Sequence, residues 1–326
     1  MINVLITGGT GLVGNGIKSY VDKLLNSNND NLLNINIEDY NFIYLSSKDC
    51  DLTDFQQTYD YFSKVNPTYV IHLAAKVGGL FKNMNYKVDM FLDNVIINNN
   101  VLKVCHQLGV AKVVSCLSTC IFPDKTTYPI DETMLHNGPP HTSNDAYAYA
   151  KRMLEVLSNA YNEQYNTNFI CVIPTNIYGP YDNYHLEDSH VIPGLIHKCY
   201  LAKLNNQPFV VSGTGAPLRQ FIYSEDLGKL ILWSLFEYDL KETIILSPPE
   251  NHEVSIKFIA EQIAQIFDYN NVQFDTNKSD GQFKKTANNN KLMNLLANQN
   301  INFIDINDGL KQNIEWFIEN YENIRK

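Results

Sequence analysis

Short apolar runs alternate with amphipathic stretches through the first half of the chain. The apolar runs, which predict strands, cover residues 2–6, 42–45, 69–73, 112–117 and 169–173. Between them, apolar residues recur at helical spacing over 12–25, 55–65, 95–108 and 146–165. Nearly continuous apolar strands separated by helices are typical of a parallel sheet that is covered on both faces. The pattern therefore predicts an α/β fold built on a doubly wound parallel sheet.

The second half of the chain is less regular. Its pattern predicts helices at 193–204, 225–238, 255–267 and 309–321, with strands at 209–212 and 243–246. We expect these elements to form a second, smaller α/β domain. The predicted boundary divides the chain into residues 1–178 and residues 179–326.

Composition narrows the class of protein. The chain has 326 residues, of which 44% are hydrophobic and 18% charged, so it can bury a sizeable core. The net charge of −10, without a Lys/Arg cluster, speaks against nucleic acid or an anionic membrane as partner. Six cysteines without a CxxC motif indicate neither a disulfide framework nor a metal site. No apolar run approaches the roughly 18 residues that span a bilayer, and residues 1–6 lack the features of a signal peptide. We therefore expect a reduced, soluble, cytoplasmic protein.

The first predicted strand runs directly into a glycine-rich segment that precedes a helix, which is the context of a dinucleotide-binding motif. Gly8 permits the tight turn, Gly11 lets the backbone approach a pyrophosphate, and Gly14 allows close packing of helix and strand. Free N–H groups at the start of the helix would then face the phosphates. A glycine-rich turn without a ligand is the alternative. The predicted site comprises Gly8, Gly9, Thr10, Gly11, Leu12, Val13 and Gly14.

The end of the second predicted strand bears on the choice of cofactor. An NAD enzyme would place Asp or Glu there to bind the ribose 2′-hydroxyl, but this chain has Ser46, Ser47 and Lys48. These residues favour NADP over NAD, unless Lys48 is only a solvated loop charge. Asp51 and Leu52 follow, where an adenine edge could be held.

A serine, a tyrosine and a lysine predict a reducing centre. Ser118 follows the fourth predicted strand, and Tyr147 and Lys151 share one helix face at i and i+4. We expect Lys151 to stabilise the phenolate and lower the tyrosine pKa from about 10. The Ser118 hydroxyl could bond the same substrate oxygen during hydride transfer. Tyr149, whose i+4 partner is Met153, is expected to be structural. With the glycine motif, this set resembles the extended short-chain dehydrogenase/reductase superfamily.

Cys120 and His190 add a second pair of candidates. A cysteine two residues after Ser118 could remove a proton α to a ketone, if a partner lowers its thiol pKa from about 8.5. Extended enzymes that dehydrate nucleotide sugars carry Asp or Glu there instead. His190, at the start of a helix, is the best candidate for an acid on the opposite side of the sugar. The plain alternatives are a small buried cysteine and a histidine without a chemical role.

Several blocks resemble the GDP-L-fucose synthase family, which are 3,5-epimerase-4-reductases of GDP-4-keto-6-deoxy-D-mannose. The matching blocks are 74–79, 114–140 with Ser118-Thr119-Cys120-Ile121-Phe122-Pro123, 174–180, Ser189-His190-Val191-Ile192-Pro193, 219–223 and 278–281. The resemblance implies that Cys120 acts as base and His190 as acid in epimerising C3 and C5. NADPH would then reduce C4, with Tyr147 protonating the oxygen.

The same resemblance implies further contacts. Those with the cofactor would include Lys151, His190, Pro174, Thr175, Asn176 and Ile177. Those with the GDP-sugar would include Lys198, Arg219 and Asp280. It also implies a homodimer formed through helices of the first domain, an NADP-binding Rossmann domain at 1–178, to which 220–240 returns, and a substrate domain at 179–326.

Two departures from the family pattern concern binding rather than chemistry. Ser212 stands where many members have Trp, and Thr10 where some bacterial members have an Arg that contacts the 2′-phosphate. Two other functions stay open at this point. One is a nucleotide-sugar 4-epimerase or 4,6-dehydratase, which would retain an oxidised cofactor and would not need Cys120. The other is a non-catalytic NADP-binding scaffold, which the presence of both Tyr147 and Lys151 disfavours.

Overall fold

The computed structural model describes residues 1–26, 32–278, 280, 282–297, 299 and 301–326. Its central sheet has six parallel strands in the order β2-β1-β3-β4-β5-β9. The strands are β1 Ile2–Thr7, β2 Tyr40–Leu45, β3 Tyr69–His72, β4 Lys112–Cys116, β5 Phe169–Pro174 and β9 Ile244–Leu246. The strand order reverses between β1 and β3, which confirms the predicted doubly wound, Rossmann-type sheet.

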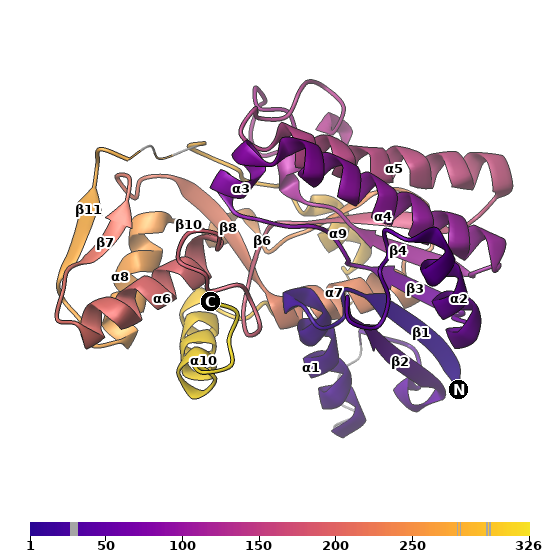
Figure 1. Ribbon diagram of the computed structural model, residues 1–326, viewed down its shortest axis with the longest axis horizontal. Coiled ribbons are helices and arrows are strands. Elements are labelled where there is room, and N and C mark those ends of the chain that lie inside the picture. Colours follow the sequence, from indigo (N-terminus) through magenta and orange to yellow (C-terminus); the bar gives the residue numbers. More distant parts are fainter. Residues whose placement is uncertain (27–31, 279, 281, 298, 300) are drawn as a thin grey trace.

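Helices cover both faces of this sheet, as Figure 1 shows. Below it in that view lie α1 (Leu12–Asn26) and α7 (Ser224–Phe236), and above it lie α4 (Lys87–Gln107) and α5 (Asp145–Tyr165). The second face also carries α2 (Phe55–Val65), and the short α3 (Leu80–Asn85) precedes α4. Alternate residues of β1 serve the two cores. Val4 and Ile6 pack with α1 and α7, whereas Leu5 packs with the helices of the other face.

A second lobe, on the left of Figure 1, has its own hydrophobic core. It contains α6 (Val191–Leu204), α8 (Ile256–Ile266) and α10 (Ile306–Glu319), with a two-stranded sheet of β7 (Phe209–Ser212) and β11 (Val272–Asp275). A three-stranded sheet joins β10 (Glu253–Ser255), β8 (Leu218–Tyr223) and β6 (Asn176–Tyr178). The remaining elements are α9 (Asn290–Leu295) and the 3-10 helices η1 (Ile37–Asp39), η2 (Thr119–Ile121), η3 (Glu132–Met134) and η4 (Glu250–His252).

The chain returns from the second lobe to the first sheet through α7 and β9. A Cβ atom on Gly16 of α1 would lie 2.1 Å from the Ser224 carbonyl oxygen of α7, so the two helix backbones are in direct contact. The returning segment therefore reaches beyond the expected 220–240, because β9 is the sixth strand of the sheet. The domain boundary at residue 178 stays a prediction.

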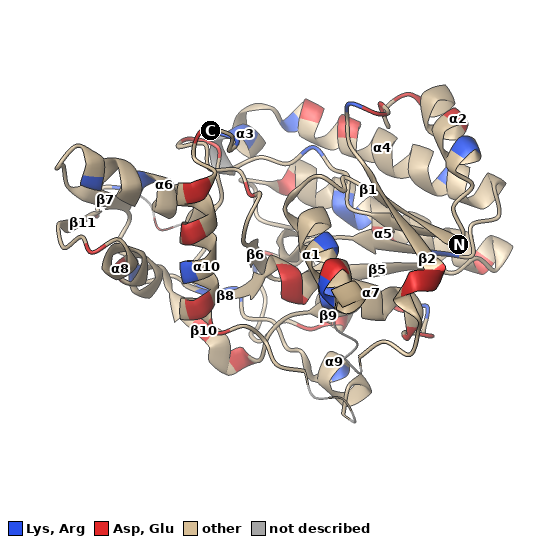
Figure 2. Cartoon of the chain, turned by 90° about the horizontal axis from the view of Figure 1, so that it is seen from below, with Lys and Arg blue, Asp and Glu red and all other residues tan. Residues whose placement is uncertain are grey.

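In the cartoon of Figure 2, acidic and basic positions are interspersed along the chain, including where α1 and α7 meet. There Lys23 pairs with Glu225, and within α1 Lys18 lies 2.8 Å from Asp22. Among the described residues, no helix is both long and apolar enough to cross a membrane.

Candidate active site

In the glycine-rich turn after β1, Gly8 and Gly14 are packed against other backbone atoms, whereas Gly11 is open. Gly8 has a φ of +67°, and a Cβ there would lie 2.9 Å from the backbone nitrogen of Ala74. A Cβ on Gly14 would lie 2.2 Å from the Gly9 carbonyl oxygen. A Cβ on Gly11 would instead meet one near atom, the Gly8 carbonyl oxygen at 3.3 Å. The backbone can therefore be approached at Gly11, just before α1 begins.

This turn fits a bound dinucleotide. The start of α1 presents unpaired N–H groups and the positive end of the helix dipole beside the open face of Gly11. Leu12 and Val13 line the same cavity as Thr175, whose buried Oγ1 has no hydrogen-bond partner in the structure. A buried hydroxyl without a partner is costly, so a polar ligand group at this wall would satisfy it.

At the end of β2, an aspartate that the sequence reasoning did not weigh shapes the loop. Ser46 donates through its backbone N (2.9 Å) and its Oγ (2.5 Å) to Asp49 Oδ2. These hydrogen bonds lower the pKa of the Asp49 carboxyl. The Ser46 hydroxyl is thus engaged, which leaves Ser47 and the exposed Lys48 to meet a phosphate. Asp51 is also engaged, because its Oδ1 accepts from Thr53.

A cavity of about 460 Å³ lies beyond the carboxyl ends of β1, β3, β4 and β5, where ligands bind in doubly wound folds. Its walls bring together most of the predicted reactive residues, from both lobes. Those in the wall are Ser118, Cys120, Tyr147, Lys151, Pro174, Thr175, Asn176, Ile177, His190 and Arg219. A larger hollow of about 630 Å³ lies along α10, lined by Asp305, Asp308 and Glu315, and does not reach these strand ends.

Lys151 and Tyr147 occupy the first turns of α5, under the end of β4. Lys151 is 2% exposed, and its Nζ donates to the Cys116 carbonyl oxygen at 2.8 Å. Burial lowers the pKa of the Lys151 ammonium. Contrary to the expectation from the i, i+4 spacing, the pKa of Tyr147 is raised well above 10, mainly by burial and then by the thiols of Cys120 and Cys116. Tyr147 is therefore held in its protonated form, which suits a proton donor.

Cys120 stands apart from the other cysteines. All six are free, and all six lie in the described part of the chain, but five are buried and only Cys120 is partly exposed. Its thiol pKa is raised by burial, and this is opposed by the Ser118 hydroxyl and by the cations of Lys285 and Lys151. Lys285, which lines the same cavity, was missed because no sequence spacing relates it to Cys120.

His190 enters the site from the second lobe as the N-cap residue of α6. Its carbonyl oxygen accepts from the Gly194 N at 3.1 Å, and its exposed imidazole lies in the cavity wall. Asp182 is 4% exposed, and its Oδ2 has no hydrogen-bond partner. Burial raises the pKa of Asp182, and the positive charge of His190 is the largest effect that opposes this rise. The site thus sets a buried carboxyl beside the histidine.

The predicted GDP-sugar contacts are spread more widely. The Arg219 guanidinium donates to the Leu218 and Gln282 carbonyl oxygens at 2.7 Å, at the rim of the cavity. Lys198 and Asp280 lie outside this wall. Burial and the nearby Lys278 lower the pKa of Lys198.

Asp280 is tied to the loop after β7. Its Oδ1 accepts from the Thr214 N at 2.6 Å, and its Oδ2 accepts from the Thr214 hydroxyl at 2.7 Å. Ser279 and Gly281, from the matching block at 278–281, lie outside the described residues. Across the described residues, no group of three His, Cys, Asp or Glu side chains could hold a metal ion.

Known proteins match this chain in sequence and in overall fold. The NAD dependent epimerase/dehydratase family model matches residues 4–246. The chain is 55% identical over 324 residues to GDP-L-fucose synthase of Dictyostelium discoideum, covering 99% of this chain and 97% of that one. It is 47% identical to the probable GDP-L-fucose synthase of Drosophila melanogaster, over 100% of both. A solved GDP-L-fucose synthetase from Naegleria fowleri, bound to NADP, has a TM-score of 0.91 and 46% identity, over 100% of this chain and 96% of that one.

Proposed function

This chain belongs to the NAD dependent epimerase/dehydratase family and, within it, to the family of GDP-L-fucose synthases, and on that premise we propose that it converts GDP-4-keto-6-deoxy-D-mannose to GDP-L-fucose. The reaction comprises 3,5-epimerisation of the sugar and NADPH-dependent reduction at C4. One observation carries the proposal. The single partly exposed cysteine of the six lies in the same cavity wall as Tyr147, Lys151 and His190.

In the epimerisation, Cys120 removes a proton from the sugar and His190 supplies one to the opposite face. The 4-keto group acidifies the C–H bonds at C3 and C5, because an enolate delocalises the charge onto the ketone oxygen. Burial raises the pKa of the Cys120 thiol, and the Ser118 hydroxyl and the Lys285 and Lys151 cations oppose that rise in favour of the thiolate. The same pair can serve both carbons in turn.

In the reduction, Tyr147 gives its proton to the C4 oxygen while Ser118 holds that oxygen. Bound NADPH supplies the hydride that reduces C4. The raised pKa of Tyr147 keeps this proton in place until the oxygen becomes basic. Lys151, whose Nζ donates to the Cys116 carbonyl oxygen, is the group that we expect to bind the nicotinamide ribose. Reduction removes the ketone, so it also ends the acidity that epimerisation requires.

Binding is assigned to groups around these centres. The turn at Gly8, Gly9, Thr10, Gly11 and Gly14 takes the pyrophosphate, and Ser47 with Lys48 takes the 2′-phosphate of NADPH, since Asp49 engages Ser46. Arg219 at the rim and Lys198 on α6 provide cations for the diphosphate of the GDP-sugar.

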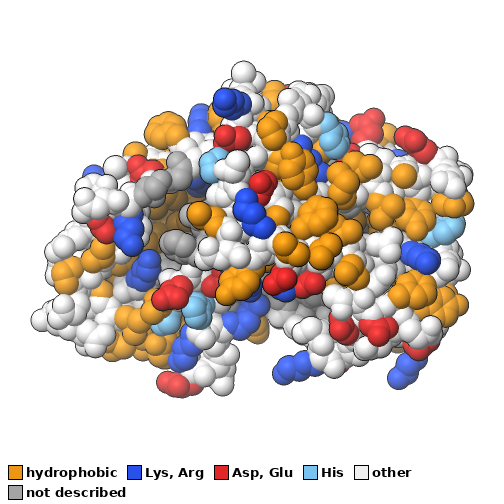
Figure 3. Space-filling model, turned by 45° about the horizontal axis from the view of Figure 1, so that its top comes forward, with side chains coloured by type: hydrophobic (Ala, Val, Ile, Leu, Met, Phe, Trp, Pro, Cys, Tyr) orange, Lys and Arg blue, Asp and Glu red, His pale blue; other side chains and the backbone are white. Residues whose placement is uncertain are grey.

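We further propose a homodimer in the cytoplasm. Figure 3 shows hydrophobic side chains gathered over the surface formed by α4 and α5. Val88, Leu92 and Ile96 project at i, i+4 spacing from α4 and are 68%, 49% and 40% exposed. Tyr149 and Met153 are exposed on α5. A second copy packed on these two helices would cover this apolar surface.

The free cysteines support a reducing compartment.

The first test uses purified protein, GDP-4-keto-6-deoxy-D-mannose and NADPH in deuterated water, with absorbance and product NMR followed together. NADPH consumption with deuterium at C3 and C5 of GDP-L-fucose is the expected result. Oxidation of NADPH without deuterium would reduce the protein to a plain 4-reductase. No reaction, with a tightly bound oxidised cofactor in the purified protein, would favour a nucleotide-sugar 4-epimerase or 4,6-dehydratase.

Two substitutions divide the roles. Cys120→Ser should abolish deuterium uptake and leave NADPH binding intact, because a serine hydroxyl is a far weaker acid than a thiol. Cys105→Ala, which removes a buried thiol of α4, is the matched control and should retain exchange. Tyr147→Phe should impair reduction more than exchange. Equal losses of both steps in Tyr147→Phe would argue against this division.

A further inference from the structure

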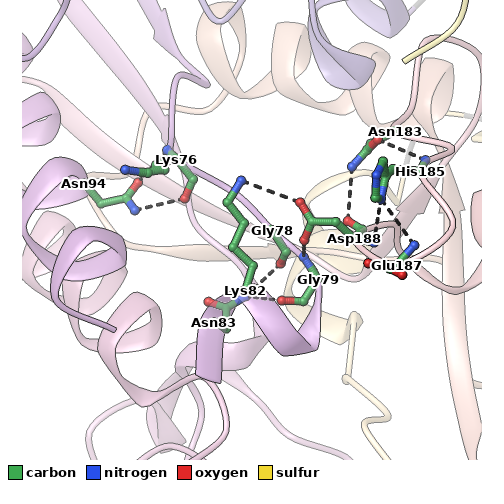
Figure 4. A network of polar contacts seen from close by, with 10 residues as sticks. All are labelled: Lys76, Gly78, Gly79, Lys82, Asn83, Asn94, Asn183, His185, Glu187 and Asp188. Carbon is green, nitrogen blue, oxygen red and sulfur yellow. Dashed lines mark hydrogen bonds and ion pairs between the residues drawn. The ribbon is translucent and has the colours of Figure 1, made fainter. Parts of the chain in front are cut away.

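Asp188, in the loop before α6, is fastened to the first lobe by its contacts with Gly79 and Lys82, which Figure 4 shows. Asp188 lies two residues before His190. Its Oδ1 accepts from the Gly79 backbone N at 2.7 Å, and its Oδ2 lies 3.5 Å from Lys82 Nζ. Gly79 belongs to the connection after β3, and it lines the cavity together with Val77 and Gly78. The Asp188 carboxylate thus links the cavity wall at Gly79 to the loop that carries His190, the proposed acid.

The two backbones approach closely at position 79, so that an added Cβ would crowd Asp188. A Cβ there would lie 3.1 Å from the carbonyl carbon of Asp188 and 3.2 Å from its oxygen. Asn83 holds the turn from the other side, since its Nδ2 donates to the carbonyl oxygens of Gly78 (2.7 Å) and Gly79 (3.0 Å). The close approach of the two backbones and the hydrogen bond from Gly79 to the Asp188 side chain therefore occur at the same place.

The segment from Asn183 to Asp188 is braced internally, so a displacement of Asp188 would carry to His190. The backbone N–H groups of Glu187 and Asp188 both donate to His185 Nδ1 at 3.2 Å. Asn183 Nδ2 donates to the Asp188 carbonyl oxygen at 3.1 Å. The next residue is bonded back as well, from the Ser189 N to the His185 carbonyl at 3.1 Å. His190 follows as the N-cap residue of α6.

We propose that Asp188 is a positioning residue for epimerisation, which holds His190 over the sugar by latching its loop to Gly79. The inference rests on the proposed function. The groups that serve reduction lie in the first lobe, Ser118 just after β4 and Tyr147 and Lys151 on α5, so they do not depend on this latch. Loss of the latch should therefore uncouple the two halves of the reaction. Some of the sugar would then be reduced at C4 before both carbons have been inverted. The resulting alcohol would appear as a second product.

The hydrogen bond from Gly79 to Asp188, rather than the ion pair with Lys82, should contribute most to holding the loop in place. The side chains of Lys82 and Asp188 are 37% and 27% exposed, and such pairs at 3.5 Å contribute little. Asp188→Asn keeps an oxygen that can accept from the Gly79 N–H but loses the charge. Asp188→Ala loses both. The two variants thus separate the hydrogen bond from the ion pair.

The experiment follows deuterium at C3 and C5 of the product per NADPH oxidised, in deuterated water at saturating NADPH. Asp188→Ala should lower the exchange rate about tenfold and yield partly unepimerised product, while NADPH oxidation falls less. Asp188→Asn and Lys82→Met should stay within about twofold of the parent. The matched control is Asp93→Ala, which removes a similarly exposed ion pair, with Lys76, that lies within the first lobe.

A second variant tests the latch from the other side. Gly79→Ala should push the two loops apart and reproduce the loss of deuterium seen with Asp188→Ala. An unchanged ratio of deuterium to NADPH in both variants would overturn the inference, as would an Asp188→Asn enzyme as impaired as Asp188→Ala. A parent protein that makes no GDP-L-fucose would instead overturn the proposed function.

Discussion

Replacing Gly16 by alanine tests whether α7 sets the position of α1 and hence of the phosphate-binding turn. The added Cβ would lie 2.1 Å from the Ser224 carbonyl oxygen, and ordinary contact requires about 3.4 Å, so the helices must separate by about 1.3 Å. Gly228 on α7 faces the same crossing, since its own Cβ would lie 2.6 Å from the Ile17 nitrogen. Both contacts are with backbone, which cannot rotate away.

The magnitude follows from two opposing effects. Overpacking of this kind costs about 3 kcal/mol at the upper end of the usual range, and alanine stabilises a helix interior by roughly 1 kcal/mol relative to glycine. Gly16→Ala should therefore lower the free energy of unfolding by about 2 kcal/mol. Because α1 begins beside the glycine turn, the displacement should also weaken NADPH binding about fivefold, or roughly 1 kcal/mol.

Urea unfolding followed by circular dichroism measures the first effect, and NADPH fluorescence titration measures the second. Gly138→Ala is the control, because its Cβ would lie 3.4 Å from Pro123 Cβ in ordinary contact. That variant should change stability by less than about 0.5 kcal/mol. A Gly16→Ala protein as stable as its parent, with unchanged NADPH affinity, would refute the close contact between α1 and α7.

Three further outcomes are expected. Lys48→Glu should raise the KM for NADPH about tenfold and leave that for NADH nearly unchanged, because it places a negative charge against the 2′-phosphate; equal changes for both cofactors would exclude the contact. Lys285→Met removes a cation that favours the Cys120 thiolate, so the pH of half-maximal deuterium exchange should rise, and an unshifted profile would contradict this role. Burial raises the pKa of Asp226 to about 6, whereas in the unfolded chain this carboxyl loses its proton near pH 4. The folded protein therefore binds this proton more tightly, and the resulting stabilisation of the fold is lost as the pH rises through 6. Asp226→Asn, which can still accept from the Ile304 N, should be more stable than the parent at pH 7.5 by up to about 3 kcal/mol but not at pH 4, as urea unfolding at both pH values would detect.

Most long elements could be predicted because their periodicity is local, but α4 begins at Lys87, well before the expected 95–108. β1, α2 and β7 follow the apolar pattern to within a residue or so, and α5 was displaced by one residue at its start. The strands β6, β8, β10 and β11 and the short helices α3 and α9 were not predicted. They have three to six residues each, and the four strands form by pairing with segments that are distant in the sequence.

In the candidate site, too, local features could be predicted from the sequence and long-range contacts could not. Motif spacing was enough to single out Ser118, Tyr147 and Lys151, since all three follow from one strand end and one helix face. It gave no sign of Lys285 or of the link between Asp188 and Gly79, because those pairs are far apart in sequence. The expected lowering of the Tyr147 pKa also failed, since burial depends on everything that packs around the ring.

By itself, the sequence determined the class of fold, the glycine turn and the family of chemistry, because these rest on residues within one strand–turn–helix unit or on short blocks of matching residues. Tertiary structure alone decided which side chains meet across the cavity, how deeply each is buried and which way its pKa moves. It also decided that β9, beyond the expected returning segment 220–240, joins the first sheet. Such properties depend on contacts between the lobes, and no local pattern encodes the distance between two segments that meet only after folding.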